Sequence, residues 1–304
     1  MSRSLNRATL AGLVAILLWS STIAVGRRIS EQLGPATAGA AVYLTAALLL
    51  APVVLSKRRA GADAERLSLR YLIGCGALFV TNMVTLFLAL GLAADRSQTV
   101  EVGLLNYLWP AFTLLFSVWL LDNRASWGLV PGTVLALLGV AVVLTGDGGF
   151  SWASLGSNLA RHPLVYALGL TAAISWGLYS NLARRWGSGD STLAVLFFVL
   201  ATGLAFLGVR LLRAEAGSLS LQVVLEVAFL GTATALAYSL WDVSMRQGEI
   251  TLVAALSYLT PFFSTVVSSL YLHVGLTKIL WLGCGLIILG SFWSWRSIVP
   301  AERH

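Results

Sequence analysis

The chain has 304 residues, of which 58% are hydrophobic and 11% are charged, and its mean hydropathy is +0.83. A soluble domain carries about 25% charged residues, so this composition excludes an ordinary soluble protein. The net charge of +7 does not indicate a nucleic-acid-binding protein. The basic residues lie at the ends of apolar segments, where lipid headgroups and the charge asymmetry of membrane proteins account for them.

Continuous apolar runs of about 20 residues, the length that an α-helix needs to cross a bilayer, recur along the chain. They do not alternate as the strands of a membrane β-barrel would, so they predict α-helices. The connections between them are short and leave no room for a separate soluble domain. In chain order we expect ten spans: 8–26, 36–55, 71–92, 98–121, 127–145, 163–183, 191–211, 222–245, 250–272 and 278–296.

The distribution of Lys and Arg predicts the orientation of these spans. If the N-terminus lies inside, thirteen of the 20 basic residues fall on the inner side and seven on the outer side. Because positively charged loops stay preferentially in the cytoplasm, both termini are predicted to be cytoplasmic. The seven outer basic residues are Arg27, Arg28, Arg96, Arg161, Arg210, Arg213 and Lys278.

The two halves of the chain repeat one pattern. Residues 106–110 of the fourth span read Asn-Tyr-Leu-Trp-Pro, and residues 257–261 of the ninth span read Ser-Tyr-Leu-Thr-Pro. Because each half has an odd number of spans, the second half must enter the membrane upside down. The pattern therefore predicts two inverted five-helix repeats, 8–145 and 163–298, which together form one transport domain around a central cavity, as in many secondary transporters. The two motifs are 151 residues apart, and the same separation relates Gly132 to Gly283 and Gly139 to Gly290. A separation of 157 residues relates Trp19 to Trp176.

These motifs resemble those of the drug/metabolite transporter superfamily, in its ten-helix branch with two EamA-type domains. The resemblance covers nearly the whole chain. It rests on Trp19 and the serine after it, on Tyr-Leu-x-Pro at 107–110 and 258–261, and on the glycine-spaced fifth and tenth spans. It implies a basket of helices around a central cavity and, within the branch, a similarity to the YddG-type exporters associated with aromatic amino acids. Many members carry Glu just after the fourth and ninth spans, whereas this chain has Asp122 and His273 there.

Two prolines lie within the fourth and ninth spans. A proline inside a helix removes a backbone donor and leaves the carbonyl four residues earlier without its bond. Pro110 frees the carbonyl of Asn106 and Pro261 frees that of Ser257, and a neighbour, water or a ligand must satisfy each one in a membrane. We predict that the two prolines are hinges and that Asn106 and Ser257 face the substrate. The alternative is a pair of static kinks that only shape packing.

Aromatic residues near the middle of the spans are candidates for a substrate-binding wall. Trp176 and Tyr179 are three residues apart, as are Tyr238 and Trp241, so each pair shares one helix face. Their rings could stack on a substrate while hydroxyl and indole N–H groups orient it. The alternative is an interfacial belt, which explains Trp293 near a span end better than it explains mid-span residues. Trp19, Tyr107, Trp109 and Tyr258 complete the predicted wall.

Other polar residues within the spans are open to two interpretations. Asn82 in the third span either contacts substrate or braces a neighbouring helix. Asp242 lies four residues before Arg246, which favours an ion pair within one helix. Because no carboxylate lies at mid-span, the sequence does not indicate obligatory proton coupling, and a substrate moving down its own gradient fits equally well.

Motifs for catalysis, phosphate binding or metal ligation are absent from the sequence. We therefore predict no enzyme, no cofactor, no metal site and no nucleic-acid partner. The favoured interpretation is a secondary transporter, a monomer or weak dimer in lipid. It would export aromatic and other neutral amino acids across a bacterial cytoplasmic (inner) membrane by alternating access. One alternative is a transporter of drugs, nucleotide precursors or other metabolites. A less favoured alternative is an integral membrane enzyme or a structural subunit.

The predicted orientation can be tested with topology reporters. Fusions after Arg59 should report the cytoplasm and fusions after Asp147 the periplasm, because the basic residues favour an inner N-terminus. A pair of reporters that are active on opposite sides of the membrane provides the measurement. The reverse pattern of activities would show that the chain is inserted the other way round.

Overall fold

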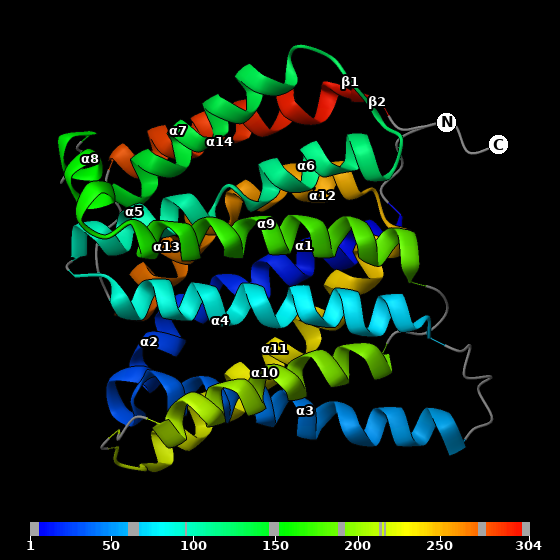
Figure 1. The fold of residues 1–304 in the computed structure, drawn as a ribbon, viewed down its shortest axis with the longest axis vertical. Helices are drawn as coiled ribbons and strands as arrows, with labels where there is room; N and C mark the ends of the chain where they lie inside the picture. The colour runs from blue at the N-terminus through cyan, green and yellow to red at the C-terminus, as the bar shows by residue number, and fades with distance from the viewer. Residues whose placement is uncertain are drawn as a thin grey trace.

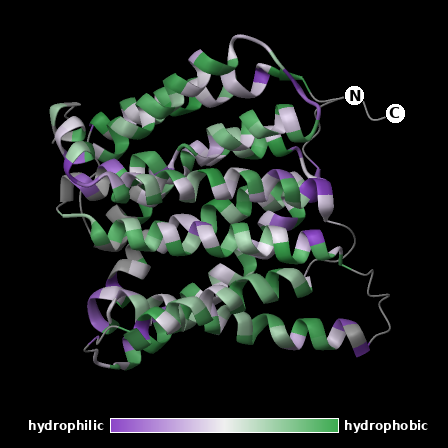
Figure 2. Ribbon diagram, in the orientation of Figure 1, coloured by the Kyte–Doolittle hydropathy of each residue, from purple (hydrophilic) through white to green (hydrophobic). Residues whose placement is uncertain are grey.

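The computed structural model describes residues 6–59, 67–94, 96–145, 152–187, 192–212, 215, 217–272 and 278–299. Long helices run side by side in both directions (Figure 1), and both ends of the chain lie on one side of the bundle. Figure 2 shows hydrophilic residues gathered towards the two ends of the helices and hydrophobic residues along their middle. Large apolar side chains such as Leu48 and Leu289 are exposed on the outer surface, as expected where lipid surrounds the helices. This is the architecture of an all-α integral membrane protein.

The first half contains seven α-helices and one π-helical turn among the described residues. They are α1 (Arg7–Ser20), α2 (Thr22–Leu33), α3 (Pro35–Arg59), the π-helix η1 (Arg70–Cys75), α4 (Gly76–Leu92), α5 (Arg96–Asn106), α6 (Trp109–Leu120) and α7 (Leu129–Thr145).

The second half follows the same order after one additional helix. Its elements are α8 (Trp152–Arg161), α9 (Pro163–Trp186), α10 (Thr192–Leu212), α11 (Leu221–Gln247), α12 (Ile250–Leu256), the 3-10 helix η3 (Ser257–Leu259), α13 (Thr260–Leu272) and α14 (Lys278–Arg296). A short antiparallel pair joins β1 (Arg124–Ala125) to β2 (Ile298–Val299) on the side of the termini.

Each predicted span coincides with helical segments of the structure. By length and apolarity alone, five helical stretches of the described chain are sufficient to cross a membrane: Pro35–Lys57, Arg70–Leu90, Glu101–Leu120, Thr192–Leu212 and Leu221–Gln247. Among the others, α9 is long enough but carries polar residues such as Ser175 and Asn181, which other helices bury. The sequence did not predict α8, whose 10 residues are too short to span a bilayer. The loop beginning at Asp147 and the position of His273 lie outside the described residues.

Both prolines lie at an irregular turn within their span: the helical stretch Glu101–Leu120 is interrupted at Tyr107 and Leu108, and the 3-10 helix η3 separates α12 from α13. Pro110 is the second residue of α6, and Pro261 is the second residue of α13, so each helix restarts just before its proline. Proline is favoured in the first helical turn because its missing N–H has no intrahelical partner there and its φ angle is already helical. The amide of Leu108 donates to the carbonyl of Leu105 at 3.0 Å, which tightens the chain at the first of these breaks.

Helices α7 and α14 approach each other through glycines at two reciprocal positions. A Cβ atom on Gly139 would lie 2.7 Å from the carbonyl oxygen of Gly283, and one on Gly290 would lie 2.6 Å from that of Gly132. Gly283 is the repeat partner of Gly132, and Gly290 is that of Gly139, so exchanging the two halves exchanges the two contacts. Such self-complementary contacts are those of a two-fold axis between antiparallel helices, as the inverted-repeat prediction requires. The two helices lie together along the top edge of Figure 1.

Glu215, in the connection between α10 and α11, caps the start of α3. Its carboxylate accepts hydrogen bonds from the amides of Ala36 at 2.9 Å and Thr37 at 2.8 Å. Burial alone would raise the pKa of Glu215. The hydrogen bonds from these backbone amides and the Thr37 hydroxyl, together with the charge of Arg210, instead hold it below its usual range. A carboxyl whose pKa is lowered by folding contributes stability above its unfolded pKa, and that contribution disappears as pH falls through the folded pKa. The cap therefore holds at neutral pH.

The close approach of α7 and α14 predicts a difference between two glycines of the same helix. Gly290→Val should destabilise the protein, because the added atoms meet the backbone of α7, and overpacking costs about 1–3 kcal/mol or more. Gly285→Val is the matched control, because a Cβ atom there meets nothing within 4 Å. Thermal unfolding of the detergent-purified variants measures the difference. Equal melting temperatures would argue against the glycine contact.

Candidate functional site

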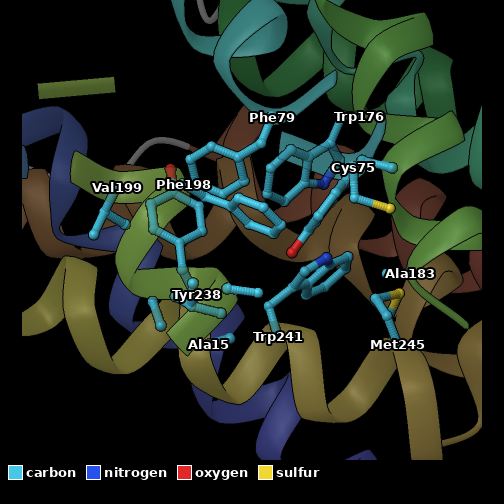
Figure 3. Packing of buried hydrophobic residues seen from close by; sticks show 14 of the residues in the cluster. Ala15, Cys75, Phe79, Trp176, Ala183, Phe198, Val199, Tyr238, Trp241 and Met245 are labelled. Atoms are coloured by element: carbon cyan, nitrogen blue, oxygen red, sulfur yellow. The ribbon is translucent and has the colours of Figure 1, made fainter. Parts of the chain in front are cut away.

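Aromatic side chains from both halves meet in the interior of the bundle. We call this group the central aromatic cluster. Its members are Trp19 of α1, Phe79 of α4, Trp109 of α6, Trp176 and Tyr179 of α9, Phe198 of α10, and Tyr238 and Trp241 of α11. Figure 3 shows several of these rings turned towards one another, with Trp241 and Trp176 face to face across the view. All members are buried except Trp19, which is half-buried.

Trp19 has a central position in this cluster. Its ring centroid lies 5.0 Å from that of Trp241, 5.4 Å from that of Tyr238 and 5.6 Å from that of Trp176. These separations are within the range in which aromatic pairs attract each other. Because Trp19 and Trp176 are repeat partners, their edge-to-face contact joins corresponding positions of the two halves. The cluster therefore lies where the halves meet, which is where inverted-repeat transporters place their substrates.

The hydroxyl of Tyr238 is bonded within the protein. Tyr238 shares a hydrogen bond of 2.8 Å with Tyr43 of α3, and the hydroxyl of Tyr43 also lies 2.9 Å from the sulfur of Met83. These contacts connect α3, α4 and α11 beside the rings. They fix the hydroxyl end of Tyr238 and leave its ring as the surface that faces Phe79, at a centroid distance of 4.7 Å.

A buried polar network lies next to the cluster, towards the side of the termini. Arg246 Nε lies 2.8 Å from Asp242 Oδ2, which confirms the predicted ion pair within α11. Asp242 also accepts hydrogen bonds from Tyr71 of η1 and, at 3.4 Å, from Tyr179 of α9. Both partners lie far from Asp242 in the sequence, so residue spacing does not predict them. The Asp242 side chain has no exposed surface, so the ion pair and the hydroxyls replace the solvation that burial removes.

The end of α9 is attached to the end of α11 on the same side. Arg184 donates to the carbonyl oxygens of Met245 at 3.1 Å and Gly248 at 2.6 Å. On the opposite side, Glu101 of α5 accepts hydrogen bonds from Tyr166 of α9 and from Asn158 of α8, the latter at 3.2 Å. Polar contacts thus connect the helices at both ends of the aromatic cluster.

The structure places two of the predicted wall residues elsewhere. Tyr107 and Tyr258 pack with Ala136, Val140 and Ile287 of α7 and α14, in a separate buried group. Helical residues two positions apart point in nearly opposite directions. Trp109 therefore faces the central aromatic cluster while Tyr107 faces away from it.

The other predicted polar site residues mostly have partners within the protein. Asn82 donates to the carbonyl of Ala172 at 2.8 Å, so it braces α4 against α9. The Ser257 hydroxyl donates to the carbonyl of Val253 at 2.7 Å, and the Ser257 carbonyl accepts from the Thr260 hydroxyl, also at 2.7 Å. Asn106 is half-buried at the end of α5. In the part of the chain that the structure describes, no group of three His, Cys, Asp or Glu residues is placed to hold a metal ion.

Comparison with known proteins shows similarity over almost the full length. The EamA-like transporter family model matches residues 6–145 and 163–296. Two similar proteins carry the name aromatic amino acid exporter YddG: that of Salmonella typhimurium is 37% identical and that of Escherichia coli is 34% identical. Each alignment covers 95% of this chain and 97% of the relative. A solved crystal structure with 26% identity matches the fold with a TM-score of 0.80, covering 94% of this chain and 96% of its own.

The buried ion pair predicts an unequal effect of single and double substitutions. Asp242→Leu leaves the Arg246 charge buried without its carboxylate and should destabilise the protein by about 3–5 kcal/mol. Asp242→Leu combined with Arg246→Met removes both charges and should recover most of that loss. Thermal unfolding in detergent compares the variants with the unmodified protein. If the double variant is as unstable as the single one, the unpaired charge is not the cause.

Proposed function

This chain belongs to the EamA-like transporter family, and on that premise we propose that it exports amino acids across the cytoplasmic membrane by alternating access. The observation that carries the proposal is the central aromatic cluster, in which the repeat partners Trp19 and Trp176 meet between the two halves. We propose that the cluster takes aromatic amino acids and also other neutral ones. The two similar YddG proteins support this substrate class by their names.

The chemistry of the cluster fits such a substrate. Binding sites for small organic molecules are mostly apolar, with a few polar groups that fix orientation. The rings of Trp176, Tyr238 and Trp241 offer faces and edges to an aromatic or long aliphatic side chain. Because one chain contributes both halves of the cluster, a monomer in lipid is a sufficient transport unit.

The two sides of the bundle are proposed to open in turn. The side of the termini carries the excess of basic residues, so we assign it to the cytoplasm, where substrate enters. On this side the Asp242 network and Arg184 connect η1, α9 and α11. On the other side Glu215 connects α3 to the loop between α10 and α11. Alternating access requires that one set of contacts opens while the other holds.

The helix breaks before Pro110 and Pro261 are proposed as the hinges of this movement. Pro→Ala at either position restores a backbone N–H and permits one continuous helix, so the protein should remain folded but transport more slowly. Initial rates of amino acid uptake into proteoliposomes, normalised to inserted protein, provide the measurement. Normal rates for both variants would show that the breaks serve packing alone.

The aromatic wall predicts a loss that depends on substrate size. Trp176→Ala or Tyr238→Ala should weaken the apparent affinity for tryptophan several-fold, since an aromatic contact contributes about 0.5–1.5 kcal/mol beyond burial. Threonine should be affected less, because its side chain makes fewer ring contacts. Competition uptake in proteoliposomes that contain only this protein compares the two substrates.

Trp293→Ala is the control for this test. Trp293 lies on α14, outside the central aromatic cluster, and is 42% exposed. This variant should keep the preference for tryptophan over threonine even if less protein is inserted. If the cluster variants change the apparent affinities for tryptophan and threonine equally, the rings do not select the substrate. If the unmodified protein moves no amino acid at all, the proposed function itself is wrong.

A further inference from the structure

Two indole N–H groups of the central aromatic cluster have no hydrogen-bond acceptor among the described residues. They belong to Trp19 and Trp241, whose Nε1 atoms are both buried. The whole Trp241 side chain is 0% exposed, and its ring lies 5.0 Å from that of Trp19. The Trp241 ring stacks on the ring of Trp176 at a centroid distance of 6.0 Å (Figure 3). Native proteins leave few buried donors without an acceptor, because each one costs free energy, so a neighbouring pair of them points to a ligand.

The start of α6 reaches the same place. Trp109 is the first residue of this 12-residue helix, and its ring lies 5.4 Å from that of Trp241. The first turn of an α-helix leaves its N–H groups without intrahelical partners and carries a partial positive charge. Here Phe112 is the first residue of α6 whose amide bonds to a carbonyl before the helix, at 2.9 Å from the oxygen of Leu108. An anion near Trp109 would therefore lie beside the helix terminus and close to the ring of Trp241.

The C-terminal end of α5 offers hydrogen-bond acceptors instead of donors. Only Tyr107 and Leu108 separate Asn106, the last residue of α5, from Trp109. The carbonyl end of a helix carries a partial negative charge. The Oδ1 atom of Asn106 is buried and has no donor in the described part of the chain. The break between α5 and α6 thus offers acceptors and donors a few residues apart, which matches the ammonium and carboxylate groups of an α-amino acid.

We propose that this break binds the charged end of the transported amino acid. The carboxylate accepts hydrogen bonds from Trp241 and Trp19 at the N-terminus of α6, and the ammonium group donates to Asn106 Oδ1 at the C-terminus of α5. This inference rests on the proposed function and adds the recognition of the zwitterion to it. The aromatic rings then select the side chain, while the break requires that both charged groups are present.

The corresponding break in the second half does not offer the same groups. There the Ser257 carbonyl accepts from the Thr260 hydroxyl, and the Ser257 hydroxyl donates to the carbonyl of Val253. Thr260 also stands at the position that corresponds to Trp109, so no indole reaches the cluster from α13. At the second break the Ser257 carbonyl is already bonded to the Thr260 hydroxyl and no indole of α13 lies beside it, so we place the zwitterion at the first break.

The test compares phenylalanine with phenylalaninamide, which keeps the ring and the ammonium group but replaces the carboxylate with a neutral amide. Both compete with labelled phenylalanine for uptake into proteoliposomes. The unmodified protein should prefer phenylalanine by about tenfold or more, which is about 1.4 kcal/mol. Trp241→Phe keeps a ring and removes the N–H. It should therefore reduce this preference several-fold, because only the apparent affinity for phenylalanine is weakened. Trp119→Phe on α6, where Trp119 is 67% exposed, should behave like the unmodified protein.

Further variants keep the test decisive. Trp19→Phe should have the same effect as Trp241→Phe and replaces it if that variant does not fold. Asn106→Leu should instead reduce the preference for phenylalanine over 3-phenylpropionate, which lacks the ammonium group. The inference would be overturned if Trp241→Phe and Trp19→Phe weakened the apparent affinities for phenylalanine and its amide equally. It would also be overturned if both variants left the preference for phenylalanine unchanged. A protein that transports phenylalanine without preferring it to the amide overturns only this inference, whereas a protein that transports no amino acid overturns the proposed function as well.

Discussion

The absence of water in the hydrocarbon core is the constraint on which this structure depends. Every backbone group there must be bonded within the protein, so a span is helical unless other protein groups satisfy its ends. The protein supplies hydrogen bonds at both proline-associated breaks. At the second break the Thr260 hydroxyl bonds to the carbonyl of Ser257, and the ring of Tyr258 is fully buried. At the first break the Leu108 amide turns back to Leu105. The breaks are tolerated because they lie inside the bundle and not against lipid.

The contact between α7 and α14 is symmetric under the repeat, whereas the central aromatic cluster is not. Helices α7 and α14 contact each other through glycines that exchange under the repeat, and neither helix contributes a ring to the central aromatic cluster. Within the cluster the halves differ, because Trp109 in the first half corresponds to Thr260 in the second. A small amino acid has no two-fold symmetry of its own. The repeat is therefore symmetric where α7 and α14 pack, and it is asymmetric where we propose that a substrate binds.

The sequence predicts the features that depend on neighbours along one helix. Trp176 with Tyr179, and Tyr238 with Trp241, share a face because they are three residues apart, and Asp242 pairs with Arg246 one turn later. Contacts between distant segments could not be predicted in this way. Tyr71 and Asp242 are 171 residues apart in the sequence and are hydrogen-bonded in the structure. Tyr71 lies in a π-helical turn, which no residue pattern predicted.

Two misplaced features have physical reasons. Tyr107 and Trp109 both lie near the middle of one span, but positions two apart face opposite ways, so Tyr107 packs on α7. Helix α8 has only 10 residues, so an apolar run of membrane-spanning length does not reveal it. Its Asn158 bonds to Glu101, a contact that becomes visible only when α5 and α8 are placed side by side.

The Asp242–Arg246 pair and the Glu215 cap differ in their exposure to water, and this difference bears on what separating each of them requires. The Asp242–Arg246 pair is buried, with side chains 0% and 4% exposed, so separating it from Tyr71 and Tyr179 leaves charges without solvent unless water enters. The Glu215 cap on α3 lies at the end of the bundle, where water can replace each lost hydrogen bond. The Asp242–Arg246 pair is therefore costly to separate from its partners without an incoming polar group. We infer that a zwitterionic substrate with its hydration water suits that role, since it brings polar groups to the buried charges as the helices part.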